Sequence, residues 1–292
     1  MKRKKSASDR VVDVFIYGSL ILLALIFLIP FWMVLVTSVV SETERLSRGL
    51  LIMYPKALDF SAYKTILSKN SQILSAYGIT IMRTVIGTAC NLLVTAMMAY
   101  GLSKRTLPFR KTLTLAIFFT SIFNPGLIPT FLAVKYTGLY DTFGAFIIPN
   151  LVVVWWMLIL RNFFMQIPDE MEEAALIDGA SPITVLFKII LPLSLPSLAT
   201  IGMFYAVWHW NSWFDGMLYI SKSSLFPVQV VLKNIISASM VENLDLYAGS
   251  VPPPLEAVKS AAIMVSTVPI LVVYPFVQKY FVKGVMVGGV KG

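Results

Sequence analysis

The chain has 292 residues, of which 57% are apolar and 13% are charged, and its mean hydropathy is +0.78. Soluble domains carry about 25% charged residues, so this composition excludes a water-soluble globular protein and indicates an integral membrane protein made of helices. The net charge of +9 is typical of membrane proteins whose basic residues gather in cytoplasmic loops, and we expect no nucleic-acid partner.

Six stretches are long and apolar enough to cross a hydrocarbon layer of about 30 Å, which takes about 20 helical residues. They cover about 14–40, 79–102, 112–134, 142–166, 185–214 and 258–281. The first follows a basic leader, Lys2 to Lys5, but it is too long for a cleavable signal core and no small-residue cleavage pattern follows it. The sequence therefore predicts one all-α membrane domain over 1–292 with six transmembrane helices.

Basic residues predict the orientation of these helices. With both termini in the cytoplasm, 14 of the 24 Lys and Arg fall in cytoplasmic segments. Four of them lie within residues 104–111, a short loop of the kind that orients neighbouring helices most strongly. The two long outer loops, 41–78 and 216–257, either dock a soluble partner or only connect helices; the first holds a possible amphipathic stretch at 63–74.

Proline and glycine interrupt several of the six stretches. Asn124-Pro125-Gly126 lies in the third, Pro192 and Pro196 lie in the fifth, and Pro269 and Pro275 lie in the sixth. Backbone groups freed by such breaks cannot face lipid, so these helices are expected to face other helices or an aqueous path. Transporters use broken helices at their sites, although ordinary helix bundles contain proline kinks as well.

Two polar residues inside the predicted spans are candidates for the substrate path. Arg83 lies about one turn into the second span, where it either snorkels to the headgroups or lines an outer cavity for an acidic sugar. Snorkelling avoids the cost of about 2.5–3.5 kcal/mol that a central arginine carries. Asn150 lies in the fourth span and, like Asn91 and Asn124, either bonds helices together or lines the path.

The loop between the fourth and fifth spans is acidic, against the basic trend of its side. Over residues 167–182 its sequence is IPDEMEEAALIDGASP. Proline followed by acidic residues favours a helix start, and Gly179 favours a left-handed helix end. Ser181 can cap the next helix, with Pro182 in its first turn. The sequence predicts either a short helix at about 169–180 with a small-residue face for a partner, or an ordinary surface loop.

The end of the fifth span is rich in aromatic residues. Trp208, Trp210 and Trp213 can stack on the C–H faces of sugars, and Asn211 can bond to sugar hydroxyls. The alternative is an aromatic belt at the membrane interface. His209 is the only histidine, which excludes an all-histidine metal site, and we expect its ring to be packed or hydrogen-bonded. The single cysteine, Cys90, excludes an intrachain disulfide.

The acidic loop also carries a family resemblance. Glu173-Ala174-Ala175, then Gly179 after three residues and Ile189-x-Leu191-Pro192 after nine more, resemble the EAA signature of bacterial ABC-importer permeases. In this family the loop is the coupling helix, which seats in the ATP-hydrolysing subunit. The resemblance implies that Glu173, Ala174, Ala175, Asp178 and Gly179 would make the coupling contacts.

Further segments resemble the carbohydrate, maltose-permease-like branch of the family. These segments are residues 226–232, residues 254–259 and the tail 274–284, and they resemble the subgroup that serves oligosaccharide-binding proteins. Within it the chain resembles the second permease subunits of alginate importers. Pro125 departs from the glycine common in relatives and would stiffen the bend in the third span.

The resemblance implies a type I importer permease of the bacterial inner membrane that has no catalytic residue, metal or cofactor of its own. ATP and Mg²⁺ would be bound by partner ATPases. The other partners would be a second, non-identical permease subunit, a periplasmic or lipid-anchored solute-binding protein and the lipid bilayer. Which oligosaccharide is carried stays open.

Two other classes compete with this interpretation. A secondary transporter or channel would need carboxylates within the membrane for ion coupling, whereas Asp13, Asp141 and Asp215 lie at span ends. A membrane-embedded enzyme would need paired carboxylates or several histidines, and the chain has one histidine.

Overall fold

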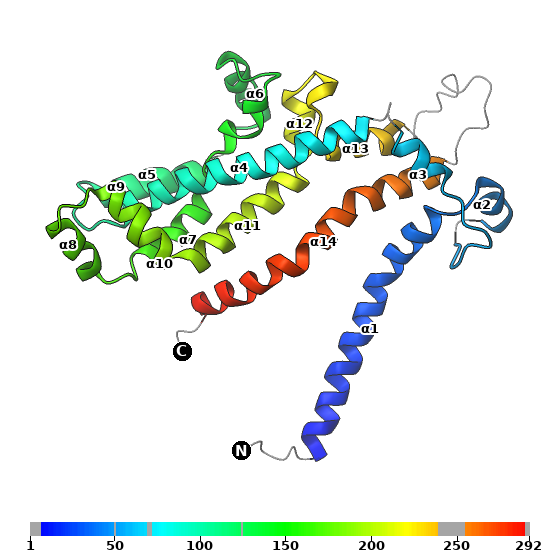
Figure 1. The fold of residues 1–292 in the computed structure, drawn as a ribbon, viewed down its shortest axis with the longest axis horizontal. Coiled ribbons are helices and arrows are strands. Elements are labelled where there is room, and N and C mark those ends of the chain that lie inside the picture. The colour runs from blue at the N-terminus through cyan, green and yellow to red at the C-terminus, as the bar shows by residue number, and fades with distance from the viewer. Residues whose placement is uncertain (1–6, 50, 69–71, 124, 239–254, 290–292) are drawn as a thin grey trace. The chain divides into compact units, whose positions relative to one another are not determined.

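The computed structural model describes residues 7–49, 51–68, 72–123, 125–238 and 255–289 (Figure 1). Every regular element in these ranges is helical. The chain divides into two compact units, which are described separately below. The first comprises residues 1–71 and 234–268, and the second comprises residues 72–233 and 269–292.

The first unit begins with α1 (Ala7–Thr37), which covers the first predicted span. Most α1 side chains are exposed, and an apolar helix with an exposed surface needs lipid or another protein around it. Residues 38–63 fold back beside the end of α1, because Trp32 Nε1 donates to the Met53 carbonyl (2.8 Å) and the Ser38 and Tyr63 hydroxyls are 2.8 Å apart.

Two short helices lie in this outer segment: α2 (Glu42–Arg48) and α3 (Ser61–Ile66). The Ser41 hydroxyl caps α2 by accepting from the Glu44 amide (3.4 Å). The predicted amphipathic stretch at 63–74 is not one helix, because α3 ends at Ile66 and α4 begins at Gln72. α14 (Leu255–Gly289) starts in this unit and continues without a break through Pro269 and Pro275.

The second unit is organised around α4 (Gln72–Ser103), an unbroken helix of 32 residues. α11 (Leu195–Asn211) and α7 (Val154–Phe164) pack along it. Small residues on α4 and α11, such as Ala96, Ala99 and Gly202, allow close approach of the helices. The core between these helices is formed by large apolar residues: Met157, Leu160, Val185, Ile201 and Tyr205.

The remaining helices of this unit are short. They are α8 (Asp169–Ile177), α9 (Pro182–Val185), the π-helical η3 (Leu186–Ile190), α10 (Leu191–Leu193), α12 (Phe214–Tyr219) and η4 (Ser223–Leu225). α13 (Val228–Ala238) starts in this unit. Figure 1 shows α8 near one end of α4 and α12 near the other.

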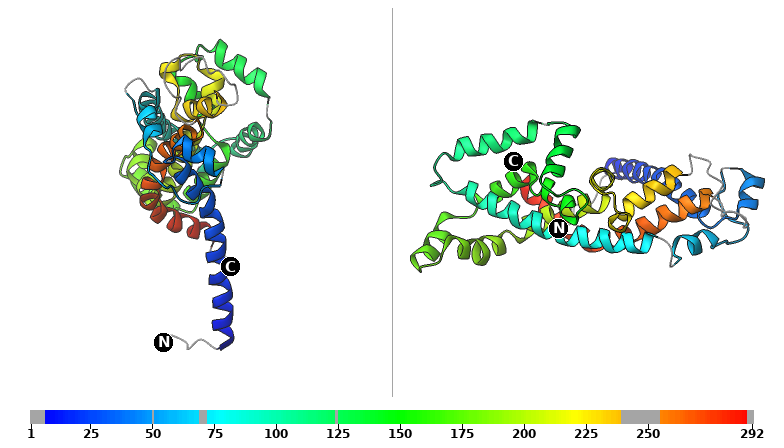
Figure 2. Two further views of the ribbon diagram at one scale, coloured as in Figure 1. Left: turned by 90° about the vertical axis from the view of Figure 1, so that its right-hand side faces the viewer. Right: turned by 90° about the horizontal axis from the view of Figure 1, so that it is seen from above.

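The third, fourth and fifth predicted spans are each bent. α5 (Arg110–Ile122) and α6 (Leu127–Tyr136) meet at 112°, with Gly126 in the left-handed region (φ 90) between them (Figure 2). η1 and η2 (Phe143–Phe146 and Ile148–Asn150) meet α7 at 57°. The fifth span bends by 88° at Ser194, between Pro192 and Pro196.

The number of membrane crossings follows only in part from these helices. Among the described residues, Arg10–Thr37 and Gln72–Ser103 are each long and apolar enough to cross a membrane, and the count rises to five if each bent pair is one span. The six-span count and the orientation therefore stay predictions. The basic leader and residues 239–254 of the second outer loop lie outside the described residues.

Candidate functional site

α8 is a short helix whose two ends are fixed by backbone geometry. Asp169 and Glu170 lie in its first turn, where the helix dipole favours negative charge. At its other end the Ala180 amide donates to the Ala175 carbonyl (2.9 Å) and the Gly179 amide to the Leu176 carbonyl (3.1 Å). This is the Schellman arrangement, and Gly179 has the positive φ of 84 that it requires.

The next helix starts as its sequence indicated. The Ser181 hydroxyl accepts a hydrogen bond from the Thr184 amide (3.2 Å), and Pro182 occupies the first turn of α9. Gly179 and Ser181 together end one helix and begin the next within three residues, which fixes the angle between α8 and the bent fifth span.

One face of α8 is held against the end of α4. Glu172 forms an ion pair with Lys104 and accepts a hydrogen bond from the Tyr100 hydroxyl (2.9 Å). Ala175 and Ala180 pack against the hydrophobic core to which Tyr100 belongs. Burial lowers the pKa of Lys104 to about 8 while Asp169 opposes the shift, so the ammonium group is still charged at neutral pH and can pair with Glu172.

The other face of α8 is exposed. Of the five predicted coupling residues, Glu173, Ala174, Asp178 and Gly179 are exposed, whereas Ala175 is half-buried against its own chain. Ile177 is 85% exposed and lies one turn after Glu173 and Ala174, on the same side of the helix. This face therefore presents carboxylates around an apolar centre.

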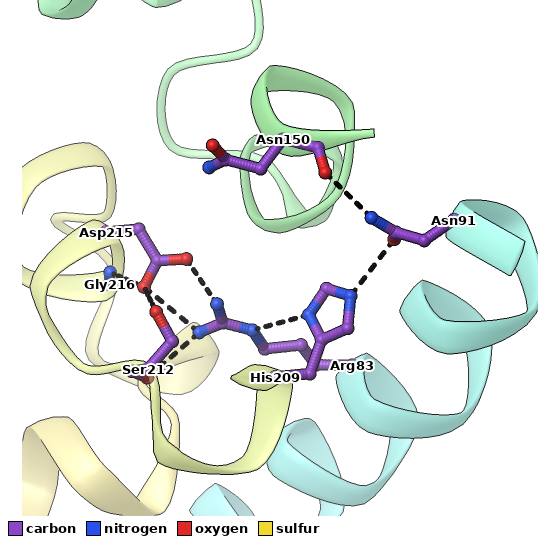
Figure 3. Close-up of polar contacts among 7 residues, drawn as sticks. All are labelled: Arg83, Asn91, Asn150, His209, Ser212, Asp215 and Gly216. Atoms are coloured by element: carbon purple, nitrogen blue, oxygen red, sulfur yellow. Dashed lines mark hydrogen bonds and ion pairs between the residues drawn. The ribbon is translucent and has the colours of Figure 1, made fainter. Parts of the chain in front are cut away.

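A buried polar cluster lies toward the other end of α4 (Figure 3). Arg83 has no exposed surface, and its guanidinium forms a two-pronged ion pair with Asp215, with Nη1 donating to Oδ1 at 3.1 Å. Nη1 also donates to the Ser212 carbonyl (3.2 Å). Both expectations for Arg83 required its side chain to reach headgroups or an open cavity. The structure corrects them, because the guanidinium is enclosed by the chain itself.

His209 continues the network in one direction. Arg83 Nε donates to His209 Nδ1 (3.4 Å), so Nδ1 must be the accepting nitrogen and Nε2 carries the proton. Nε2 lies 3.1 Å from Asn91 Oδ1, and Asn91 Nδ2 donates to the Asn150 main-chain carbonyl (2.7 Å). His209 is thus buried and hydrogen-bonded as expected, and Asn150 takes part through its backbone, with its side chain exposed.

The sequence interpretation missed Asp215 as the partner of Arg83, although a signal was present. Both residues lie near the same predicted side of the membrane, Arg83 early in the second span and Asp215 just past the end of the fifth. Because an unpaired charge is costly at such a site, opposite charges at matching depth could have been paired.

One residue of α7, five residues of α11 and the residue that follows α11 line a pocket of about 540 Å³: Trp156, Met203, Phe204, Val207, Trp208, Asn211 and Ser212. Two predicted path residues, Trp208 and Asn211, therefore share this aromatic pocket. Trp210 does not line it, and its indole N–H is buried without a partner in the described part of the chain. Trp213 lies elsewhere, with Lys233 Nζ 3.9 Å from its ring centre.

The chemistry of the aromatic pocket suits a sugar ring better than a metal. Indole rings stack on the C–H face of a sugar, and the amide of Asn211 and hydroxyl of Ser212 can bond to sugar hydroxyls. Among the described residues, no group of three His, Cys, Asp or Glu side chains could hold a metal ion.

Two curated bacterial proteins resemble the chain over nearly its whole length. The polygalacturonan/rhamnogalacturonan transport system permease protein YtcP of Bacillus subtilis is 41% identical over 286 residues, covering 97% of this chain and 99% of that protein. Protein LplC of the same species is 42% identical over 267 residues, covering 91% and 90%. No protein-family profile matches the chain.

Two solved structures are also similar to the chain. A chain of a bacterial ABC transporter involved in the import of the acidic polysaccharide alginate superposes with a TM-score of 0.84 at 33% identity, covering 96% of this chain and all of that one. A chain from the alginate transporter in complex with a pentasaccharide-bound periplasmic protein has a TM-score of 0.64 at 13% identity, which supports the fold alone.

Proposed function

Because the chain belongs to the permease subunits of carbohydrate ABC transporters, we propose that it is one membrane-spanning subunit of an ATP-driven, binding-protein-dependent oligosaccharide importer in a bacterial inner membrane. Permease subunits of this family are not enzymes, and neither is this chain. The observation that carries the proposal is α8, whose exposed face can dock on an ATPase while its other face is tied to α4.

In the proposed mechanism, the exposed face of α8 seats on an ATPase subunit that binds ATP and Mg²⁺. Glu173, Ala174, Asp178 and Gly179 make the contact together with Ile177, and Ala175 supports the helix from behind. Closure of the ATPases moves α8, and the fixed angle at Gly179 passes that motion to the fifth span. Nucleotide thereby shifts the population between two conformations of the transporter.

The proposed cargo is an oligosaccharide that contains uronic acid. One relative is named for the transport of polygalacturonan and rhamnogalacturonan, and one structural neighbour is involved in the import of alginate; all three polymers contain uronate sugars. We infer that the sugar passes the aromatic pocket and contacts Trp208 and Asn211. Alginate oligosaccharides and oligogalacturonates are the two narrower alternatives.

The proposed assembly has four kinds of component. Beside this chain it contains a second, related but non-identical permease, two ATP-binding subunits and a solute-binding protein on the periplasmic side. One structural neighbour, at 33% identity, is a chain of an ABC transporter involved in import, and this supports the proposed importer assembly. With α8 in the cytoplasm, the aromatic pocket and polar cluster lie toward the outer side.

The coupling assignment is tested in the purified transporter reconstituted in liposomes, with oligogalacturonate and alginate oligosaccharide as probes. Glu173→Ala and Ile177→Asp should each reduce uptake at least tenfold, because they alter the exposed face of α8. Lys222→Met is the control, because Lys222 forms an exposed pair with Asp141 far from α8. Normal uptake by both α8 variants would refute the coupling role.

A secondary transporter is the main rival, and energy dependence separates the two. The proposal expects uptake to require ATP inside the liposomes and to stop when the ATPase subunits are omitted. Uptake by this chain without ATPase subunits, driven by an ion gradient, would instead establish the rival.

A further inference from the structure

We propose that Arg83 and Asp215 are positioning residues for the aromatic pocket. Their buried ion pair fixes the break between α11 and α12, and it thereby fixes where Trp208 and Ser212 stand in the pocket wall. The inference rests on the proposed function, in which this pocket carries the oligosaccharide.

The cluster and the pocket share residues. Ser212 lines the pocket, its carbonyl accepts from Arg83 Nη1 (3.2 Å), and its hydroxyl donates to Asp215 Oδ1 (2.9 Å). Trp208 also lines the pocket, with its ring centre 5.9 Å from the Arg83 guanidinium carbon. The ion pair thus bonds to one of the seven pocket residues and lies within cation–π range of a second.

The pair bonds to the backbone on both sides of the break between α11 and α12. α11 ends at Asn211, and Ser212 is extended (φ −72, ψ 120) before α12 begins at Phe214. Arg83 donates to the carbonyl of Ser212, the residue that directly follows α11. The amides at the start of α12 carry positive partial charge, and Asp215 accepts from the Gly216 amide (2.8 Å).

The same pair fixes α11 against α4. Arg83 comes from α4 and holds His209 of α11 through Nδ1, while Asn91 holds the other ring nitrogen. Gly87 makes room for this contact, because a Cβ there would lie within 2.8 Å of three atoms of the His209 ring. Rotation or sliding of α11 would break these bonds. The neighbouring pocket residues Trp208 and Ser212 are therefore held in place.

The direction of these bonds distinguishes positioning from simple charge balance. Arginine can only donate and ionised aspartate can only accept. Exchanging the two residues would keep the net charge of the pair. It would also place an acceptor against the Ser212 carbonyl and a donor against the Gly216 amide, so the break between α11 and α12 would lose these two bonds.

The test measures uptake in cells that express the complete transporter, with a labelled oligogalacturonate as probe and the permease in the membrane quantified by immunoblot. The exchanged pair, Arg83→Asp with Asp215→Arg, and the apolar pair, Arg83→Met with Asp215→Leu, should raise the half-saturating probe concentration about tenfold. The maximal rate per permease should fall less. Ser212→Ala removes one bond and should raise half-saturation two- to threefold.

Two further variants keep the test decisive. If either double variant fails to reach the membrane, Arg83→Lys retains the buried charge and still loses the forked contact, so half-saturation should rise at least threefold. Lys222→Met, in the exposed pair with Asp141, should match the wild type. Wild-type half-saturation in the exchanged pair, or a lowered maximal rate with unchanged half-saturation in all Arg83 and Asp215 variants, would overturn the positioning role.

If the pocket does not carry the sugar at all, the variants give a different pattern of uptake. Trp208→Ala and Asn211→Ala test the pocket itself. If both leave uptake unchanged, the sugar does not pass the pocket and both proposals about it fall. If both impair uptake while the exchanged pair behaves as wild type, the pocket stands and only the positioning role of Arg83 and Asp215 is refuted.

Discussion

The two ion pairs along α4 differ in burial. The pair of Arg83 and Asp215 has side chains 0% and 9% exposed, whereas the pair of Lys104 and Glu172 has side chains 27% and 19% exposed. A buried charge cannot lose its partner cheaply, but a half-exposed charge can turn to water instead. The Arg83 end of α4 is therefore locked, and the Lys104 end can release α8 at moderate cost.

The contrast between the two ion pairs is tested most directly by a substitution of Arg83. Arg83→Met leaves the Asp215 carboxylate buried without its partner, and we expect a loss of about 3–5 kcal/mol in the free energy of unfolding. Equilibrium unfolding of the purified transporter in mixed micelles measures it. The double variant with Asp215→Leu should regain most of the loss, because no charge then remains buried. Equal losses in the single and double variants would contradict this account.

Gly87 provides the next largest effect. Gly87→Ala would push a methyl group into the His209 ring, and overpacking of this kind costs about 1–3 kcal/mol. Gly78 is the matched control on the same helix, since a Cβ there meets nothing within 4 Å. Gly78→Ala should stabilise by about 0.5–1 kcal/mol. Similar unfolding energies for the two alanine variants would show that His209 does not press on α4.

At the other end of α4, Glu172→Gln keeps the size of the side chain and an acceptor for Tyr100 but removes the charge facing Lys104. We expect a loss of about 1 kcal/mol in unfolding free energy, because both partners are half-buried. Hydrogen exchange of the α8 amides should increase as well. A loss as large as that of Arg83→Met would end the contrast between the two ends.

The exposed pair of Lys222 and Asp141, with side chains 65% and 20% exposed, gives the smallest effect. Lys222→Met should change the free energy of unfolding by about 0.5 kcal/mol or less. The backbone amides of Ser221 and Lys222 still donate to the Asp141 carboxylate in this variant (3.0 and 2.9 Å). A loss above that of Glu172→Gln would show that exposure does not rank these pairs.

Local rules predicted much of the fold from sequence. The end of α8 at Gly179 and the cap at Ser181 depend on contacts within four residues, so the sequence indicated both. The breaks around Gly126 and Ser194 followed from nearby prolines. Pro269 and Pro275 did not break α14, because a proline removes one backbone bond but does not by itself end a long helix.

The same local rules did not predict the contacts between residues far apart in sequence. The partner of Arg83 is 132 residues away in sequence, and that of Lys104 is 68 residues away. Only the packing of α11 and α8 against α4 brings these charges together. Helical periodicity also did not reveal that Ala175 turns inward while Ala174 faces out, since the direction of each face depends on where the core lies.

α4 differs from the bent spans in having no break along 32 residues. At 1.5 Å per residue, about 30 Å of stiff helix separates Arg83 from Ser103. Such a helix acts as a lever arm: a tilt of about 5° imposed at the α8 end would displace the Arg83 end by roughly 3 Å. That displacement is about the length of one hydrogen bond, so even a small tilt at the α8 end would strain the bond from Arg83 to Ser212 that helps to hold the far end in place.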